Sequence, residues 1–373
     1  MINKPVSSAK CCNSHSHKRT REPLLPPPSA LMSSASFITG APLTQSLTNR
    51  ASEAFCWALL ALAQVHAGQV PGSIRSSRRA FALSQESKNA WVHVASTNAL
   101  TYGLLDAGTY EEAFEITQHT MAFARTLPPT INFQHVLTAL GSTYQALQQW
   151  EEARSTLTEA DALAETLDLG RLRAPALSQL CMNYAVTGEW EQAHTYALQA
   201  IAIRKSKSAD MPLLLLDFSR TYEMEALLRA GDEHQAREAM RHLEERLGSN
   251  RRSCIPYLRS LAILAAWEAE RERAIGHLRE AAQLAAEIGL PGEQWQIQAA
   301  LGSVYETAGE QGQARTAFGE AATIIRGLAE GIKDEKLRSR FLAGPQIHRC
   351  CSTPNALPPR SRTTTGSRVG FDS

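Results

Sequence analysis

A short phrase recurs at a nearly constant interval through the middle of this chain of 373 residues. It reads roughly Gly/Gln-x-Trp/Tyr/Gln-Glu-x-Ala, and its closing position falls at residues 74, 113, 153, 193, 236, 274 and 314. Successive closing positions therefore differ by 39, 40, 40, 43, 38 and 40. A fixed period of this size predicts a solenoid, in which each unit buries its apolar face only against its neighbours.

The segments on either side of each phrase are rich in Ala and Leu and carry apolar residues at helical spacing. Gly108, Gly188, Gly231 and Gly309 lie inside the units, where a left-handed cap would end the first helix of a pair. We therefore expect an all-α superhelix, a solenoid of about seven helical hairpins with disordered tails. The hairpins are expected near residues 52–88, 90–127, 131–168, 172–207, 213–248, 253–290 and 292–330.

The third unit shows how a hairpin is expected to pack. One face of its first helix carries Leu140, Gly141 and Tyr144, and one face of its second helix carries Ala153, Leu157 and Ala160. We expect Gly141 and Ala153 to be small because the two helix backbones approach each other there. The acids at the start of the second helix, Glu151 and Glu152, oppose the positive end of the helix dipole and are interpreted as structural.

Replacing Ala153 or Ala193 by leucine should overpack this seam and lower the free energy of unfolding by about 1–3 kcal/mol. Chemical denaturation of each variant beside the parent chain measures the loss. An unchanged unfolding midpoint would show that these alanines do not lie between two helices.

The units are similar to the tetratricopeptide consensus, as Leu140-Gly141-x2-Tyr144 with Ala153-x3-Leu157 and Ala160 shows. The same pattern returns in the seventh unit as Leu301, Gly302, Tyr305, Ala314, Phe318 and Ala321. The resemblance covers about 280 residues, with a period longer than the usual one of about 34 residues. Long-period arrays of this kind resemble those of large bacterial regulators, in which a STAND-type ATPase accompanies a LuxR-type DNA-binding domain or a class III nucleotide cyclase.

Residues 328–345 are similar to the ending of such regulator arrays, with Asp334, Leu337, Phe341 and Pro345 at matching places. We expect a basic disordered tail at 1–50, a repeat array at 51–330, a capping helix at 331–345 and a second disordered tail at 346–373. Ile332, Leu337 and Phe341 would form the apolar stripe of the capping helix. One hypothesis is that both tails are non-homologous extensions, as a truncated or frameshifted reading frame would produce.

The charges are unevenly distributed along the chain. Residues 1–50 carry six Lys or Arg and one Glu (+5), and residues 345–373 carry four Arg and one Asp (+3). Residues 51–344 therefore carry 28 basic and 35 acidic side chains (−7), which does not favour a nucleic-acid partner. No run of 18 apolar residues occurs, so no membrane partner is expected. The seven scattered cysteines favour a reducing, cytoplasmic location.

The common catalytic motifs are missing from the sequence. It contains no Gly-x4-Gly-Lys-Ser/Thr, Gly-x-Gly-x-x-Gly, His-Glu-x-x-His or Gly-x-Ser-x-Gly, and we expect no enzyme activity, catalytic residue or cofactor. Cys11, Cys12, His15 and His17 carry donor atoms that suit zinc, but they lack the paired spacing of structural zinc sites. No metal site is therefore predicted, and a disordered tail is the preferred interpretation.

The tetratricopeptide resemblance implies that first helices line a concave surface. Projecting the binding positions onto this chain nominates Asn98, Tyr102, His135, Gln145, Thr221, Glu225, Arg229, Arg259 and Trp267 as partner-binding residues. Trp267 can equally serve in core packing. A local basic group is either a salt-bridged surface or a docking point for an acidic segment; its members are Arg241, Arg246, Arg251, Arg252 and Arg259.

We therefore predict a non-catalytic scaffold for protein–protein interaction, whose concave groove receives a protein or peptide ligand. The alternative is a fragment of a multidomain signalling or transcriptional regulator, in which the array senses a ligand for ATPase and effector domains that are missing here. The sequence does not name the ligand, the pathway or the oligomeric state.

Overall fold

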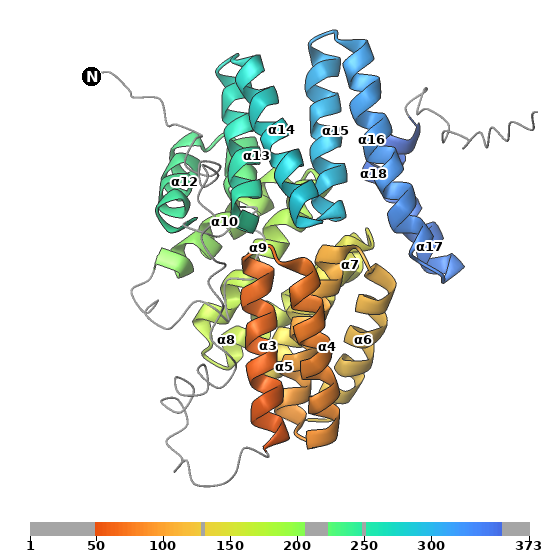
Figure 1. Ribbon diagram of the computed structural model, residues 1–373. Helices are drawn as coiled ribbons and strands as arrows, with labels where there is room; N and C mark the ends of the chain where they lie inside the picture. The colour runs from red at the N-terminus through yellow and green to blue at the C-terminus, as the bar shows by residue number, and fades with distance from the viewer. Residues whose placement is uncertain (1–48, 128–130, 206–222, 248–250, 353–373) are drawn as a thin grey trace, which may run out of the picture.

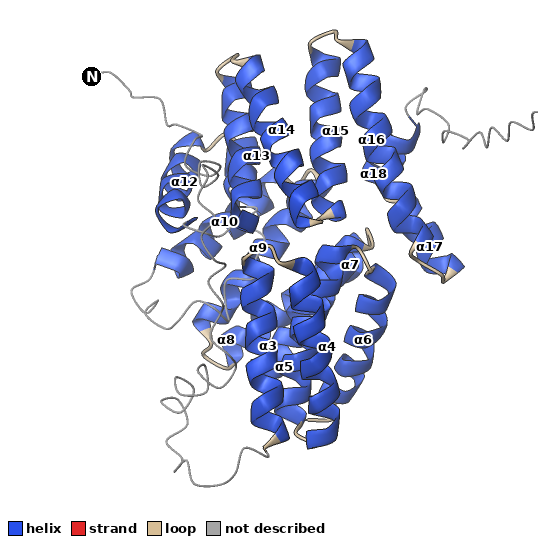
Figure 2. Ribbon diagram, in the orientation of Figure 1, coloured by secondary structure: helices blue, strands red, loops and turns tan. Residues whose placement is uncertain are grey.

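In the computed structural model, residues 49–127, 131–205, 223–247 and 251–352 are described, and they form sixteen helices and no strand (Figures 1 and 2). The prediction of an all-α chain is confirmed. Residues 1–48 and 353–373 of the two proposed tails, with Cys11, Cys12, His15 and His17, lie outside the described residues, as does Thr221.

Fourteen of these helices form seven hairpins in chain order, as the repeat predicts. The pairs are α3 (Arg50–His66) with α4 (Val70–Ser87), α5 (Ala90–Ala107) with α6 (Tyr110–Ala124), α7 (Ile131–Ala146) with α8 (Trp150–Thr166), α9 (Gly170–Thr187) with α10 (Trp190–Lys205), α11 (Glu223–Arg229) with α12 (Glu233–Leu247), α13 (Arg251–Trp267) with α14 (Arg271–Ile288), and α15 (Pro291–Thr307) with α16 (Gln311–Glu330).

One backbone conformation marks the turn inside every hairpin. Residues 68, 108, 148, 188, 231, 269 and 309 all have positive φ, between 59° and 87°. Five of them are glycines, which adopt this conformation without a steric cost, whereas Gln148 and Ala269 occupy it with a Cβ. The predicted left-handed caps are therefore present, and they extend to units whose sequence shows no glycine there.

The seam of the third hairpin differs in one respect from the sequence-based expectation. A Cβ placed on Gly141 would lie 2.5 Å from Cγ and Cδ2 of Leu157. The three atoms nearest to this position all belong to the Leu157 side chain, so the glycine makes room for a side chain of the second helix. Gly302 and the ring of Phe318 repeat the arrangement in the seventh hairpin, at 2.9 Å.

The superhelix brings its two ends together. In Figure 1, α13 to α16 stand above α3, α4 and α6. Gly68 and Gly108, in the turns of the first two hairpins, lie against Ile288 at the end of α14 and Leu328 near the end of α16. The edge formed by the early turns is therefore covered by the late units.

An apolar cluster, here called the closure core, joins these ends. Its buried members come from both parts of the array: Leu100, Leu104, Leu105, Tyr110, Ala113 and Leu147 from the second and third hairpins, and Trp295, Ala321, Ile325, Leu328, Ala329, Ile332, Leu337, Phe341, Ile347 and Cys350 from the end of the array and the helices after it. Contacts of this kind are additional to the nearest-neighbour packing of a simple solenoid.

Two short helices complete the closure core. α17 (Glu335–Leu342) lies within the segment predicted as a capping helix, and Ile332, Leu337 and Phe341 are buried in the closure core. α18 (Pro345–Ser352) occupies the first residues of the predicted second tail, so that prediction is wrong for residues 346–352. The helix packs against α16 and α17, and its side chains Ile347 and Cys350 are buried in the closure core, at 0% and 3% exposure.

Replacing Ala269 by glycine should stabilise the protein by about 0.5–1 kcal/mol, because glycine removes the strain of a side chain at positive φ. The matched change, Gly309→Ala, introduces that strain at the equivalent turn and should destabilise the protein by about 1 kcal/mol. A Cβ at position 309 meets no other atom within 4 Å, so the backbone strain is the whole of the expected effect. Thermal or chemical unfolding measures both. The same sign of change in both variants would contradict this account of the turns.

Candidate functional site

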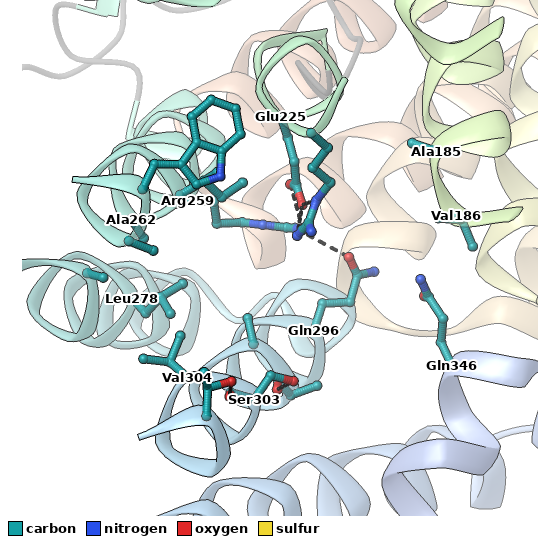
Figure 3. A pocket seen from close by; sticks show the side chains of 18 of the residues that line it. Ala185, Val186, Glu225, Arg259, Ala262, Leu278, Gln296, Ser303, Val304 and Gln346 are labelled. Atoms are coloured by element: carbon teal, nitrogen blue, oxygen red, sulfur yellow. Dashed lines mark hydrogen bonds and ion pairs between the residues drawn. The ribbon is translucent and has the colours of Figure 1, made fainter. Parts of the chain in front are cut away.

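A pocket of about 860 Å³ opens among the helices of the second half of the array (Figure 3). The first helices α9, α11, α13 and α15 supply most of its lining, and α10, α14, α16 and α18 close its sides. Most of the lining is apolar and much of it is alanine, including Ala262, Ala266, Ala299 and Ala300. Small side chains on facing helices leave room between them, so the alanine-rich lining accounts for the open space.

An ion-pair group occupies one side of the pocket. Arg259 Nη2 lies 2.9 Å from Glu225 Oε2, while its Nη1 lies 3.3 Å from Glu293 Oε2 and 3.3 Å from Gln296 Oε1. Figure 3 shows Glu225, Arg259 and Gln296 pointing toward one another from three different helices. The guanidinium of Arg259 therefore joins α11, α13 and α15 across the pocket.

Arg229 extends this group toward the solvent. Its Nη2 donates to Glu225 Oε1 at 2.9 Å, and its guanidinium carbon lies 5.9 Å from the ring centroid of Trp190, within reach of a cation–π contact. Burial opposes ionisation of Glu225, but Arg259 and Arg229 together outweigh it and lower the pKa of this carboxyl. Glu225 is therefore a carboxylate at neutral pH.

Four of the nominated partner-binding residues meet at this pocket: Glu225, Arg229, Arg259 and Trp267 all line it. Trp267 is 47% exposed, so of its two possible roles the geometry favours the surface one over core packing. The basic group predicted near residue 251 is a set of ion pairs. Arg251 pairs with Glu287, and Arg252 pairs with Asp106.

The other four nominated residues within the described chain do not line the pocket. Asn98 and Gln145 are only 8% and 4% exposed, and the Gln145 amide donates to the backbone oxygen of Gln179 at 2.7 Å. Tyr102 packs against the closure core, and His135 is largely enclosed. The cause is packing: Asn98 and Tyr102 lie on α5, which contacts both α3 and α7, and His135 and Gln145 lie on α7, which contacts both α5 and α9.

Several pocket residues were not anticipated from the sequence. Trp190 belongs to the recurring phrase and was assigned to the turn. Gln296 occupies in the seventh unit the register position that His135 occupies in the third, so projection of the repeat could have found it. Gln346 and Cys350 come from α18, for which the sequence carries no helical signal long enough to detect.

Neither a metal cluster nor a membrane span was found in the described residues. No group of three or more His, Cys, Asp or Glu side chains there is placed to hold a metal ion. None of the described helices combines the length and the apolar character needed to cross a membrane.

The fold is shared with solved helical-repeat structures. A Rap protein complexed with competence and sporulation factor matches with a TM-score of 0.60 and 12% identity, over 77% of this chain and 78% of that one. Aspartyl phosphate phosphatase F from Bacillus subtilis matches with a TM-score of 0.53 and 14% identity, over 79% and 74% of the two chains. The Cut9–Hcn1 hetero-tetramer of the APC/C matches with a TM-score of 0.50 and 14% identity, over 86% of this chain and 59% of that one.

These likenesses confirm a tetratricopeptide-type α-solenoid. The sequence matches no protein-family model and no curated protein. At 12% to 14% identity the likeness extends to the fold alone.

We expect His135 to make the stability of this region depend on pH. Burial lowers its pKa to about 4, and its Nε2 has no hydrogen-bond partner among the described residues. The folded protein thus holds a neutral ring, whereas the unfolded chain takes up a proton near pH 6.5. As the pH falls from 6.5 to 4, the unfolding free energy should decrease by up to about 1.4 kcal/mol per pH unit on this account.

The His135→Gln variant should lose this part of the acid dependence. Below pH 6.5 its free energy of unfolding should therefore fall less steeply with pH than that of the parent chain. Urea denaturation at several pH values measures both slopes. His242→Gln, which removes an exposed imidazole, is the control. Equal slopes for the parent and His135→Gln would contradict the assignment of a neutral, buried ring.

Proposed function

We propose that this chain is a non-catalytic scaffold for protein–protein interaction and that the pocket between α9, α11, α13 and α15 receives an extended segment of a partner. The observation that carries the proposal is the pocket itself, which combines an apolar, alanine-rich lining with polar groups at one side. Sites with this composition use apolar area for affinity and a few polar groups for orientation. Two of the structural neighbours are named as complexes, which supports an interaction role for this fold.

The exposed side chains suggest how a peptide would be held. Trp267 and the half-exposed guanidinium of Arg229 are rigid or planar groups of the kind that act as anchors in interfaces. The amides of Gln296 and Gln346, whose ends point toward each other in Figure 3, can pair with the backbone of an extended segment. Affinity would then arise from one or two anchors and several modest polar contacts.

The second candidate function is that of a sensor array from a larger regulator, acting in the cytoplasm. Its specific support is the sequence ending at residues 332–345, where α17 and the start of α18 stand. Both functions use the same pocket and differ in whether the bound segment is the final partner or a signal. The search for further regulator domains in the neighbouring nucleotide sequence separates them.

A peptide selected from a displayed library on the full chain should lose at least about tenfold in affinity when Trp267 is replaced by alanine, as expected for a central aromatic anchor. Isothermal titration calorimetry measures the affinity. Trp91→Ala is the matched control, because Trp91 is 44% exposed yet lies outside the pocket, against Phe55. If the affinity of the peptide falls in Trp91→Ala and is unchanged in Trp267→Ala, the binding site lies elsewhere and the proposal is refuted.

A further inference from the structure

The pocket and the closure core share side chains. Trp295 and Cys350 line the pocket and also belong to the closure core, together with Leu100, Leu104 and Leu105 of the second hairpin. These two side chains therefore pack against the closure core on one side and line the pocket on the other. Separating the two ends of the superhelix would remove the packing that holds Trp295 and Cys350 in place at the pocket.

A chain of alternating charges makes a second connection between the pocket and the closure. Glu293, which pairs with Arg259 at the pocket, also lies 3.8 Å from Arg252. Arg252 in turn forms a two-pronged pair with Asp106 of α5, with N···O distances of 2.6 and 3.0 Å. Asp106, Arg252 and Glu293 are 4%, 11% and 5% exposed as side chains. Breaking one of these ion pairs leaves a buried charge without part of its compensating partner charge. The pairs therefore favour a rearrangement in which the pocket and the contact between the ends change together.

A third contact ties α17 to the second hairpin. The backbone N–H groups of Lys333 and Asp334 donate to the two carboxylate oxygens of Glu111, at 2.5 and 2.8 Å. Glu111 lies in the first turn of α6, so one carboxylate holds the start of a helix that is distant in the sequence. The rings of Tyr110 and Phe341 meet beside it, with centroids 6.0 Å apart.

We propose that the contact of α15, α17 and α18 with α5 and α6 is a latch, and that its closure is coupled to occupation of the pocket. The hairpins between the two ends remain joined by their own neighbours, so release of the latch changes the curvature of the superhelix without unfolding its repeats. The proposal rests on the proposed function only in naming the pocket as the place where the ligand acts.

The direction of the coupling follows from where a ligand would make contacts. Ala185 and Val186 on α9 form one wall of the pocket, while Gln296 on α15 and Gln346 on α18 form the facing wall (Figure 3). A ligand that touches both walls gains more contacts in the latched form than in the open one. It therefore stabilises the latch, and by linkage any change that weakens the latch lowers the affinity for the ligand by the corresponding factor.

The first test is hydrogen exchange of the full chain without a ligand. Glu111→Gln leaves one carbonyl oxygen where two carboxylate oxygens accept hydrogen bonds, and we expect exchange of α17, α18 and α15 to rise together by about tenfold. Exchange of α3 and α4 should stay unchanged, which shows that the variant is folded. Glu112→Gln is the matched control, since Glu112 pairs with Arg78 inside the early hairpins at 2.7 Å. Faster exchange at α17 alone, with α15 and α18 as in the parent chain, would overturn the latch.

The second test uses the library-selected peptide whose binding depends on Trp267. Glu111→Gln should weaken its binding by several-fold, and saturating peptide should slow exchange at α17, which the peptide does not need to touch. An unchanged affinity in Glu111→Gln, together with faster exchange at α15, would overturn the coupling. Failure to obtain any Trp267-dependent peptide would count against the proposed function, while the exchange experiment would still decide whether the latch exists.

Discussion

The contact between the two ends of the array is the constraint on which the rest of the structure depends. Leu105 lies in the second hairpin and Trp295 in the seventh, yet both belong to one buried cluster. A solenoid held only by neighbouring units can vary its curvature at low cost, because each interface tolerates a small rotation. Once the closure core and the Asp106–Arg252 pair form, the sum of those rotations is set, and with it the shape of the pocket.

The hairpins could be predicted from the sequence because they are encoded locally. A turn with positive φ, a small residue at the seam and apolar residues at helical spacing all lie within one repeat unit. Gln148 and Ala269 take the turn conformation without a glycine, and the backbone hydrogen bonds at these turns come from the same hairpin, so the hairpin itself requires the conformation. α18 could not be predicted, since it has only eight residues and its buried side chains Ile347 and Cys350 pack in a cluster that extends from α16 and α17 to the second and third hairpins.

The binding positions show where prediction by register succeeds and where it stops. Asn98 precedes Ala113, the closing alanine of its phrase, by the same interval as Arg259 precedes Ala274. Tyr102 and Glu225 likewise share one register position in their own units. In the second half of the array these positions line the pocket, whereas in the first half they are packed against adjacent helices or the closure core. The repeat thus predicts which side chains face inward, and the curvature of the superhelix decides which of them remain accessible.

The third residue of the recurring phrase likewise has different surroundings in different units. Tyr110 is buried in the closure core, Trp150 packs with Met182 between adjacent units, and Trp190 lines the pocket beside Arg229. Each aromatic ring begins a second helix for the same local reason, yet each meets a different surface. Because a ring at this position can pack, close the array or face a ligand, its role is determined by the segment that the superhelix places opposite it. Fold and binding therefore draw on one repeated position of the array.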